Sequence, residues 1–208
     1  MMMNFQTLKR TAWFLHPGLA CGVLVALLLA APGLRAEVKF DADELDALLR
    51  VKVRTVQHMA LNPLLVRATL RQNMQKLPMD EIKRLDDEWR ASKELTPFKQ
   101  SLQSSQSGRF LKDTVTRLGS LNEAFLTDNQ GANVAAYPAT SDYWQGDETK
   151  WTASFKEAQG EVFIGDLELD ESTQTYAVKI SAPVIDRGKT IGVLVVGVTV
   201  GYVESKGQ

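Results

Sequence analysis

The stretch TSDYWQGDETKW, residues 140–151, concentrates two tryptophans, a tyrosine and three carboxylates within twelve positions. Aromatic side chains often form the walls of small-molecule pockets, and a few polar groups then fix the ligand. A carboxylate such as Asp142 or Asp170 in an aromatic-walled pocket would hold an amine or a quaternary ammonium through charge and cation-π contact. The stretch therefore points to ligand binding.

Several of these residues have a structural explanation that is about as good. Trp151 lies at helical spacing from other apolar residues, a pattern that equally predicts core packing. Asp170 precedes polar residues and would also suit a turn. For Tyr143 and Trp144 we favour contact with a ligand, because a surface loop does not usually expose two large aromatic side chains together.

Catalysis is less well supported by the residues present. Asp142, Asp147 and Glu148 supply carboxylates, but their spacing does not fix the facing geometry that acid/base work needs. DLELDE, residues 166–171, lacks the glycine and the terminal glutamate spacing of an EF-hand. His58 is not accompanied by a recognisable nucleophile elbow with a serine or cysteine, so we expect it to be an ordinary residue of the long helix. We therefore expect neither an enzyme nor a cofactor.

The length and composition of the chain limit its domain organisation. With 208 residues, 44% of them hydrophobic and 24% charged, the chain suits one domain with a sizeable core. Residues 1–36 combine Lys9 and Arg10 with a short apolar run and a small residue, Ala36, which is typical of a cleaved secretory signal. An uncleaved membrane anchor is the less favoured alternative, because about 20 apolar residues are needed to span a bilayer.

Cleavage would remove three cations and move the net charge from −1 to −4. The mature chain would hold no cysteine and one histidine, which excludes disulfides, a thiol nucleophile and a histidine-based metal cluster. No basic stripe or Lys/Arg run is evident, so nucleic acid is not an expected partner. The predicted location is the periplasm.

Residues 37–118 read as the helical part of the domain. The apolar spacing predicts one long helix over residues 42–60, introduced by Asp41 and Glu44 as a capping box. Asn62 and Pro63 then predict the cap and first residue of a second helix. A third helix follows, with acids in its first turn, and we expect the polar stretch SLQSSQSG, residues 101–108, to be a loop.

Residues 119–208 read as strands. Two short strands joined at residues 128–131 are followed by three longer ones, and short turns favour an antiparallel meander. The run at residues 191–203 is rich in valine and too short for a membrane span, so we expect a buried central strand. Residues 138–159 form a helical insertion between the second and third strands, with Asp147 expected as its cap.

The strand part resembles the extracytoplasmic Cache sensor domain, a PAS-like fold found in bacterial chemoreceptors, histidine kinases and cyclases. The likeness is carried by FLTDNQGANVA, TSDYWQGDETKW, VFIGDLELDEST and ISAPVIDRGKTIGVLVVGV, and more weakly by LNPLLVRATLRQN and LDDEWRAS. It implies an α+β fold, with a long N-terminal helix and shorter helices packed on a five-stranded antiparallel sheet. It also implies a small-molecule pocket roofed by the segment between the second and third strands.

In this resemblance Trp151 matches the aromatic residue that follows the insertion loop, and Asp170 matches an acidic residue near the end of the third strand. Amino-acid-binding members carry an arginine just before the tryptophan, where this chain has Thr149 and Lys150. The predicted ligand-binding residues are Tyr137, Asp142, Tyr143, Trp144, Trp151 and Asp170, with Tyr137 and also Lys179 placed near the pocket only by strand order.

Two hypotheses follow. The first is an exported, single Cache-like sensor domain that binds a small molecule under residues 138–151. Only residues 204–208 follow the last predicted strand, so we expect it to signal through a separate membrane partner, such as a sensor kinase, a cyclase or a chemoreceptor. The alternative is a structural or interaction module that acts through its long N-terminal helix, docking a partner or forming a homodimer.

Overall fold

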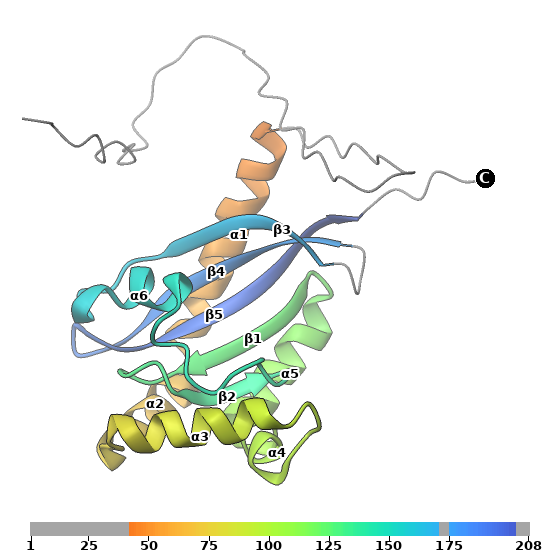
Figure 1. The fold of residues 1–208 in the computed structure, drawn as a ribbon. Helices are drawn as coiled ribbons and strands as arrows, with labels where there is room; N and C mark the ends of the chain where they lie inside the picture. The colour runs from red at the N-terminus through yellow and green to blue at the C-terminus, as the bar shows by residue number, and fades with distance from the viewer. Residues whose placement is uncertain (1–41, 171–174, 203–208) are drawn as a thin grey trace, which may run out of the picture.

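The computed structural model describes residues 42–170 and 175–202, so the predicted signal segment lies outside the described residues. Five strands form one antiparallel sheet (Figure 1). They are β1 (Leu121–Thr127), β2 (Asn133–Tyr137), β3 (Phe163–Asp170), β4 (Thr175–Asp186) and β5 (Lys189–Tyr202). The order across the sheet is β2-β1-β5-β4-β3. This confirms the predicted α+β class with a five-stranded antiparallel sheet.

The strand order is not a simple meander. β3, β4 and β5 follow one another, but β5 then pairs with β1 and joins the first pair of strands to the last three. The predicted central position of the last strand is confirmed, and its residues from Gly192 to Val198 are buried. Its uninterrupted apolar run reflects coverage on both faces.

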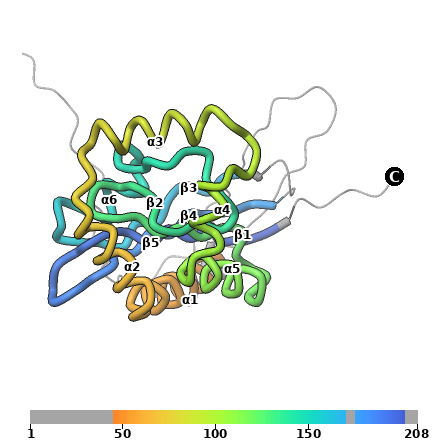
Figure 2. Tube along the Cα trace, turned by 90° about the horizontal axis from the view of Figure 1, so that it is seen from below, coloured from red at the N-terminus to blue at the C-terminus, as the bar shows by residue number. Residues whose placement is uncertain are grey.

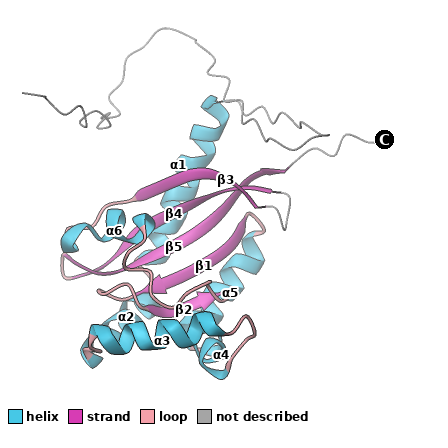
Figure 3. Ribbon diagram, viewed as in Figure 1, coloured by secondary structure: helices cyan, strands magenta, loops and turns pink. Residues whose placement is uncertain are grey.

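Helices lie on both sides of this sheet (Figures 2 and 3). They are α1 (Ala42–Ala60), α2 (Pro63–Gln75), α3 (Met79–Ala91), α4 (Pro97–Ser104), α5 (Gln106–Leu118) and α6 (Thr149–Phe155), followed by a 3-10 turn, η1 (Lys156–Ala158). α1, α2 and α5 share one side of the sheet, whereas α3 and α6 lie on the other. In the described residues, no helix is long and apolar enough to cross a bilayer.

Local sequence signals account for most helix ends. Asn62 caps α2, because its side-chain oxygen accepts a hydrogen bond from the Leu64 amide at 2.9 Å, and Pro63 begins the helix as predicted. α6 begins at Thr149 with Glu148 at its N-cap position, so the prediction that Asp147 caps this helix is wrong. The predicted capping box at Asp41 lies outside the described residues.

The expectation of a loop at residues 101–108 is also wrong. α4 runs to Ser104, and α5 begins at Gln106. The only break is Ser105, whose hydroxyl oxygen accepts a hydrogen bond from the Gly108 amide at 2.9 Å and so caps α5. Serine is strongly favoured at N-cap positions. A serine that caps a helix gives the sequence the same polar composition that a loop would have.

The main core lies between the sheet and the layer of α1, α2 and α5. Alternate residues of β1, β4 and β5 pack there against these helices, among them Leu126, Ile180 and Val196. On the opposite face, a smaller cluster joins β1, β2 and β5 to Trp151 and Phe155 of α6. Because strand side chains alternate between faces, the residues between those of the main core point toward α6.

Candidate functional site

One row of side chains crosses the sheet beneath α6. Phe125 of β1 pairs with Val195 of β5, Val195 pairs with Ser181 of β4, and Ser181 pairs with Phe163 of β3. Phe125 and Val195 belong to the cluster that packs on α6, so the row shares the face that α6 covers. Ser181 is the polar member of an otherwise apolar row and has no exposed surface.

α6 places two side chains over this row. The Nζ atom of Lys150 lies 5.7 Å from the centroid of the Phe125 ring. Trp151 packs against the same cluster and stacks on Phe155, with ring centroids 4.6 Å apart and an interplanar angle of 14°. Only 17% of the Lys150 side chain is exposed, and its partner is Glu148 at 3.3 Å. A largely covered lysine side chain therefore places its ammonium near an aromatic ring.

Two hydrogen-bonding atoms beneath α6 have no acceptor. Within the described part of the chain, Trp151 Nε1 and Ser181 Oγ are buried and make no hydrogen bond. An indole nitrogen can only donate, whereas a hydroxyl donates one bond and accepts others. A buried donor left unpaired costs on the order of 1–3 kcal/mol. Together with Lys150, these groups form a set of donors on one face of the sheet.

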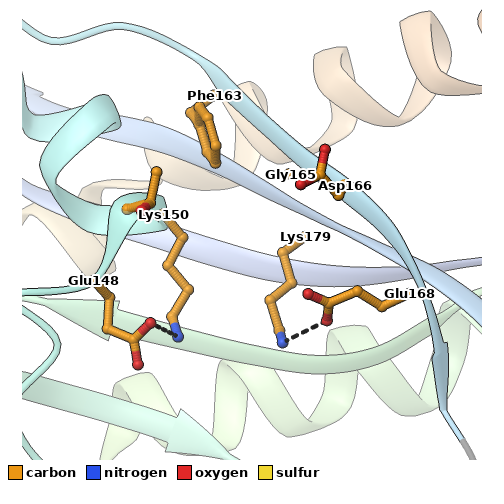
Figure 4. A pocket seen from close by; sticks show the side chains of 8 residues that line it. Glu148, Lys150, Phe163, Gly165, Asp166, Glu168 and Lys179 are labelled. Carbon is orange, nitrogen blue, oxygen red and sulfur yellow. Dashed lines mark hydrogen bonds and ion pairs between the residues drawn. The ribbon is translucent and has the colours of Figure 1, made fainter.

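A pocket of about 290 Å³ opens beside this row, between the start of α6 and the strands β3 and β4, of which β3 is at the edge of the sheet (Figure 4). It is lined by Glu148, Thr149, Lys150, Phe163, Gly165, Asp166, Glu168 and Lys179. The Lys150 and Lys179 side chains extend in the same direction, and each ends beside a glutamate. The pocket thus combines an aromatic wall with two cations and three carboxylates.

The lysine on β4 lies between carboxylates from two other strands, the adjacent β3 and the more distant β1. Lys179 Nζ lies 3.5 Å from a carboxylate oxygen of Glu168 on β3 and 3.8 Å from one of Glu123 on β1. Glycine at position 197 of β5 separates Lys179 from Glu123 in the register. Among the described residues, no group of three or more His, Cys, Asp or Glu side chains could hold a metal ion.

A second hollow, of about 640 Å³, lies along α6 and the turn that follows it. Its lining is Trp151, Thr152, Phe155, Lys156, Glu157 and Gln159. Of the six predicted ligand-binding residues, Trp151 alone borders either of these two hollows. The predicted site residues are therefore divided among α6, the loop before it and the ends of β2 and β3.

The loop before α6 is tied to α3 by a buried carboxylate. An oxygen of Asp86 accepts the backbone N–H groups of Tyr143 at 2.8 Å and Trp144 at 3.0 Å. The other Asp86 oxygen pairs with Arg90 at 3.2 Å. The Trp144 indole N–H donates to the Gln130 carbonyl at 2.7 Å. These bonds fix the loop against both α3 and the turn between β1 and β2.

Tyr143 is 3% exposed and lies in a hydrophobic cluster with Trp89 and Phe98. Its ring centroid is 5.1 Å from that of Phe98 and 5.8 Å from that of Trp89. Burial, reinforced by the charge of Asp128, raises the pKa of the Tyr143 phenol. Packing alone accounts for the burial of this side chain.

The remaining predicted residues lie apart from the row beneath α6. Asp142 accepts hydrogen bonds from Ser141 and Gln145 within the loop. Tyr137, at the end of β2, packs against the main core on the opposite face of the sheet. Asp170 ends β3, where it pairs with Thr175.

Sequence reasoning missed Lys150 and Ser181 as candidates and ranked Lys179 low. The signal was present in TYAVKISAPVI, residues 175–185, where apolar residues alternate with Lys179 and Ser181. Period-two alternation places these two side chains on the face opposite the core. In the sequence, Lys150 stands out only as a residue in the place of an arginine, although it directly precedes Trp151 of α6.

No protein-family model matches the sequence, and no curated protein matches it. Solved structures that resemble the chain include sensory ligand-binding domains. The chemoreceptor Tlp3 of Campylobacter jejuni, in complex with 4-methylisoleucine, is 20% identical, with a TM-score of 0.36 over 76% of this chain and 57% of that one. The DctB histidine kinase sensor domain of V. cholerae is 17% identical, with a TM-score of 0.35 over 74% and 57%.

The amino-acid chemoreceptor PctC of Pseudomonas aeruginosa, in complex with GABA, is 12% identical, with a TM-score of 0.36 over 76% of this chain and 61% of that one. The chain spans only 57–64% of the length of the first four such structures. These proteins are of the class that the sequence resemblance implies. At such TM-scores the likeness does not extend to the ligand.

Proposed function

We propose that the chain is an exported sensor domain that binds a small carboxylate-bearing molecule beneath α6. The observation that carries this proposal is the set of donors between α6 and the sheet, two of them from α6 and one from Ser181 of the row beneath it. Lys150 supplies a positive charge there, and Trp151 Nε1 and Ser181 Oγ are buried without partners in the described residues. A carboxylate offers the acceptor oxygens that such donors require.

The neighbouring pocket has room for the rest of a small ligand. Its volume of about 290 Å³ lies just below the range of roughly 300–1,000 Å³ that is typical of ligand sites. Phe163 supplies an apolar wall, and Lys179, with Glu168 beside it, lines the same pocket. A ligand carboxylate would displace the Glu148 contact of Lys150, so the site would exchange one ion pair for another.

The proposal also includes the predicted ligand-binding residues of the loop before α6. Asp142 and Trp144 precede α6, and Tyr143 anchors the loop in the cluster with Trp89. We propose that the loop sets the position of α6 over the sheet and that Asp142 and Trp144 contact the part of the ligand that extends outward. Tyr137 and Asp170 are the weakest members of the predicted set.

We further propose that the domain acts outside the cytoplasm after cleavage of residues 1–36 and reports ligand occupancy to a separate membrane protein. The alternative is a module that acts through α1 without a ligand. An observation that favours this alternative is the exposed apolar surface of α1, where 58% of Val51 is accessible. A ligand screen separates the two functions.

The first test is a thermal-shift screen with short-chain carboxylates, amino acids and amines. A ligand at about one hundred times its dissociation constant stabilises the native state by about 2.7 kcal/mol. For a domain of this size, that corresponds to roughly 5–10 °C in Tm. We expect carboxylates to raise the Tm and simple amines to leave it unchanged. A shift with amines alone would instead favour Asp142 as the ligand-binding group.

The second test uses variants that remove single donors. Ser181→Ala and Trp151→Phe should each weaken binding about 5- to 10-fold, the scale of one hydrogen bond. Lys150→Met should weaken it more, because a charged donor is lost. Lys156→Met is the matched control, since Lys156 is an exposed lysine of η1 that pairs with Glu161. Equal loss in the control and in Lys150→Met would overturn the assignment.

A further inference from the structure

The charge of the chain is unevenly distributed along its sequence. Between Asp46 and Asp80 there are six cations and no carboxylate. A second stretch, from Glu94 to Asp113, is likewise free of acids and holds three more cations. The six cations of the first stretch are Arg50, Lys52, Arg54, Arg67, Arg71 and Lys76, and the three of the second are Lys99, Arg109 and Lys112. The cations are dispersed at helical intervals, so they form no run that could be seen in the sequence.

The fold gathers most of these cations on one side. α1, α2 and α5 form a single layer on one face of the sheet (Figure 2), and their inner surfaces share the main core. Arg54 of α1, Arg67 and Arg71 of α2, and Arg109 and Lys112 of α5 are exposed. We call the outer surface of α1, α2 and α5 the basic layer. Arg117 of α5 adds a further exposed cation to it, and Asp113 is an exposed acid there.

In the part of the chain that the structure describes, the exposed cations of the basic layer are mostly without a carboxylate partner, although Arg50 of α1 pairs with Asp46. Among the described residues, Arg54, Arg67 and Arg71 take part in none of the ion pairs. On α3, by contrast, Arg84 pairs with Glu81 and Glu88. The positive charge of the basic layer is therefore only weakly compensated, although the whole chain is slightly acidic. Such a face attracts anions over a distance set by the salt concentration.

Large apolar side chains are exposed among these cations. Met74 of α2 is 78% exposed, Leu61 after α1 is 56% exposed and Val51 of α1 is 58% exposed. Cations mixed with exposed apolar side chains suit the boundary between phosphate headgroups and acyl chains. A purely electrostatic contact with an acidic protein would not require the apolar residues.

We propose that the basic layer docks on the surface of a bilayer that contains anionic phospholipid. The arginines would lie among the phosphates, and Met74 and Leu61 would contact the acyl boundary. The opposite side, with α3, α6 and the candidate ligand pocket, would then face away from the membrane. This proposal is independent of the ligand, since it concerns the other face of the sheet.

The test places an environment-sensitive fluorophore on each side of the full chain. Cys21 is the only cysteine and is replaced by serine, and the label is attached through Met74→Cys on α2 or through Ala91→Cys at the end of α3. With phosphatidylcholine vesicles that contain phosphatidylglycerol, we expect a blue shift at position 74 and none at position 91. Pure phosphatidylcholine vesicles should shift neither label. Insertion of the apolar residues 1–36 alone would leave position 74 in water.

Charge variants complete the test. Arg67→Glu with Arg71→Glu should weaken the anionic-vesicle response of the position 74 label by at least about twentyfold, because each cation contributes separately near an anionic surface. Lys83→Glu with Arg84→Glu is the charge-matched control on α3. This pair should change the response of the position 74 label to anionic vesicles by less than about threefold. Raising the salt from about 0.1 to about 1 M shortens the Debye length from roughly 10 to roughly 3 Å and should abolish the shift.

Three results would overturn the proposal. The first is an equal shift at position 74 with and without phosphatidylglycerol. The second is an equal loss in the two charge-reversed pairs. The third is recognition of an acidic protein by the basic layer while anionic vesicles give no response. Circular dichroism melts of each variant, compared with the wild type, show that the charge-reversed chains are folded.

Discussion

At the scale of single residues, Asp128 shows how burial and hydrogen bonding oppose each other. It is 2% exposed and accepts the backbone N–H groups of Gln130 at 2.8 Å and Ala132 at 2.9 Å, and the Gln72 side-chain N–H at 3.0 Å. These bonds favour the charged carboxylate, but desolvation favours the neutral form more strongly. The net effect raises the pKa of Asp128 above its ordinary value.

This shift predicts a specific dependence of stability on pH. Because the pKa of Asp128 is higher in the folded chain, the folded state binds more protons than the unfolded state between the unfolded and folded pKa values. The contribution of Asp128 is then fully present below its unfolded pKa of about 3.9 and is lost as the pH rises through the folded pKa. Urea unfolding of the wild type and of Asp128→Asn at several pH values measures the contribution of Asp128 to the free energy of unfolding.

The free energy of unfolding of the wild type relative to Asp128→Asn should fall as the pH rises from about 4, because only the wild type ionises there. Other groups titrate in both proteins and cancel in the difference. A difference that grows with pH would mean that the folded pKa of Asp128 is depressed, contrary to the dominance of desolvation.

At the scale of elements, the junction of α4 and α5 explains both a failure of sequence reasoning and a requirement for glycine. Serine and glutamine at residues 101–107 gave no apolar periodicity long enough to predict two short helices. The structure makes the junction compact, because Ser105 caps α5 and brings Gly108 against the end of α4. A Cβ atom at Gly108 would overlap the backbone carbonyl oxygens of Leu102 and Gln103.

Gly108→Ala should therefore lower the free energy of unfolding by about 1–3 kcal/mol, the usual cost of overpacking. For a domain of this size, the Tm should fall by roughly 2–10 °C. Ser104→Ala, at the exposed end of α4, is the matched control and should leave the Tm nearly unchanged. A wild-type Tm for Gly108→Ala would show that the two helices can separate without cost.

Most elements could be predicted where a local pattern decides them. The amphipathic spacing of α1, the Asn62 cap of α2 and the valine-rich run of β5 were sufficient. The candidate site depends instead on register across four strands, which brings Phe125, Ser181 and Phe163 into one row with Val195. No local signal in the sequence specifies which strands will be neighbours, so this row could not be predicted. The basic layer was missed for the same reason.

At the scale of the whole molecule, the sheet separates two surfaces with different chemistry. One side carries α3, α6 and the pocket, and the other carries α1, α2 and α5 with their exposed cations. Asp86 connects residues far apart in the sequence on the pocket side, because it lies on α3 and bonds the backbone of residues 143 and 144. The position of the loop before α6 therefore depends on a helix from the first half of the chain.

Asp86→Ala tests this dependence directly. The substitution leaves two backbone N–H groups without their acceptor, and a buried unpaired donor costs on the order of 1–3 kcal/mol. Hydrogen exchange at the Tyr143 and Trp144 amides should become at least about tenfold faster than in the wild type, and the melting temperature should fall. Arg90→Ala is the control, since it removes the partner of Asp86 but keeps both N–H bonds.

If exchange at these two amides were unchanged in Asp86→Ala, the loop would be held by the Trp144 indole and the aromatic cluster instead. If both variants accelerated exchange equally, Asp86 would act mainly through its ion pair with Arg90.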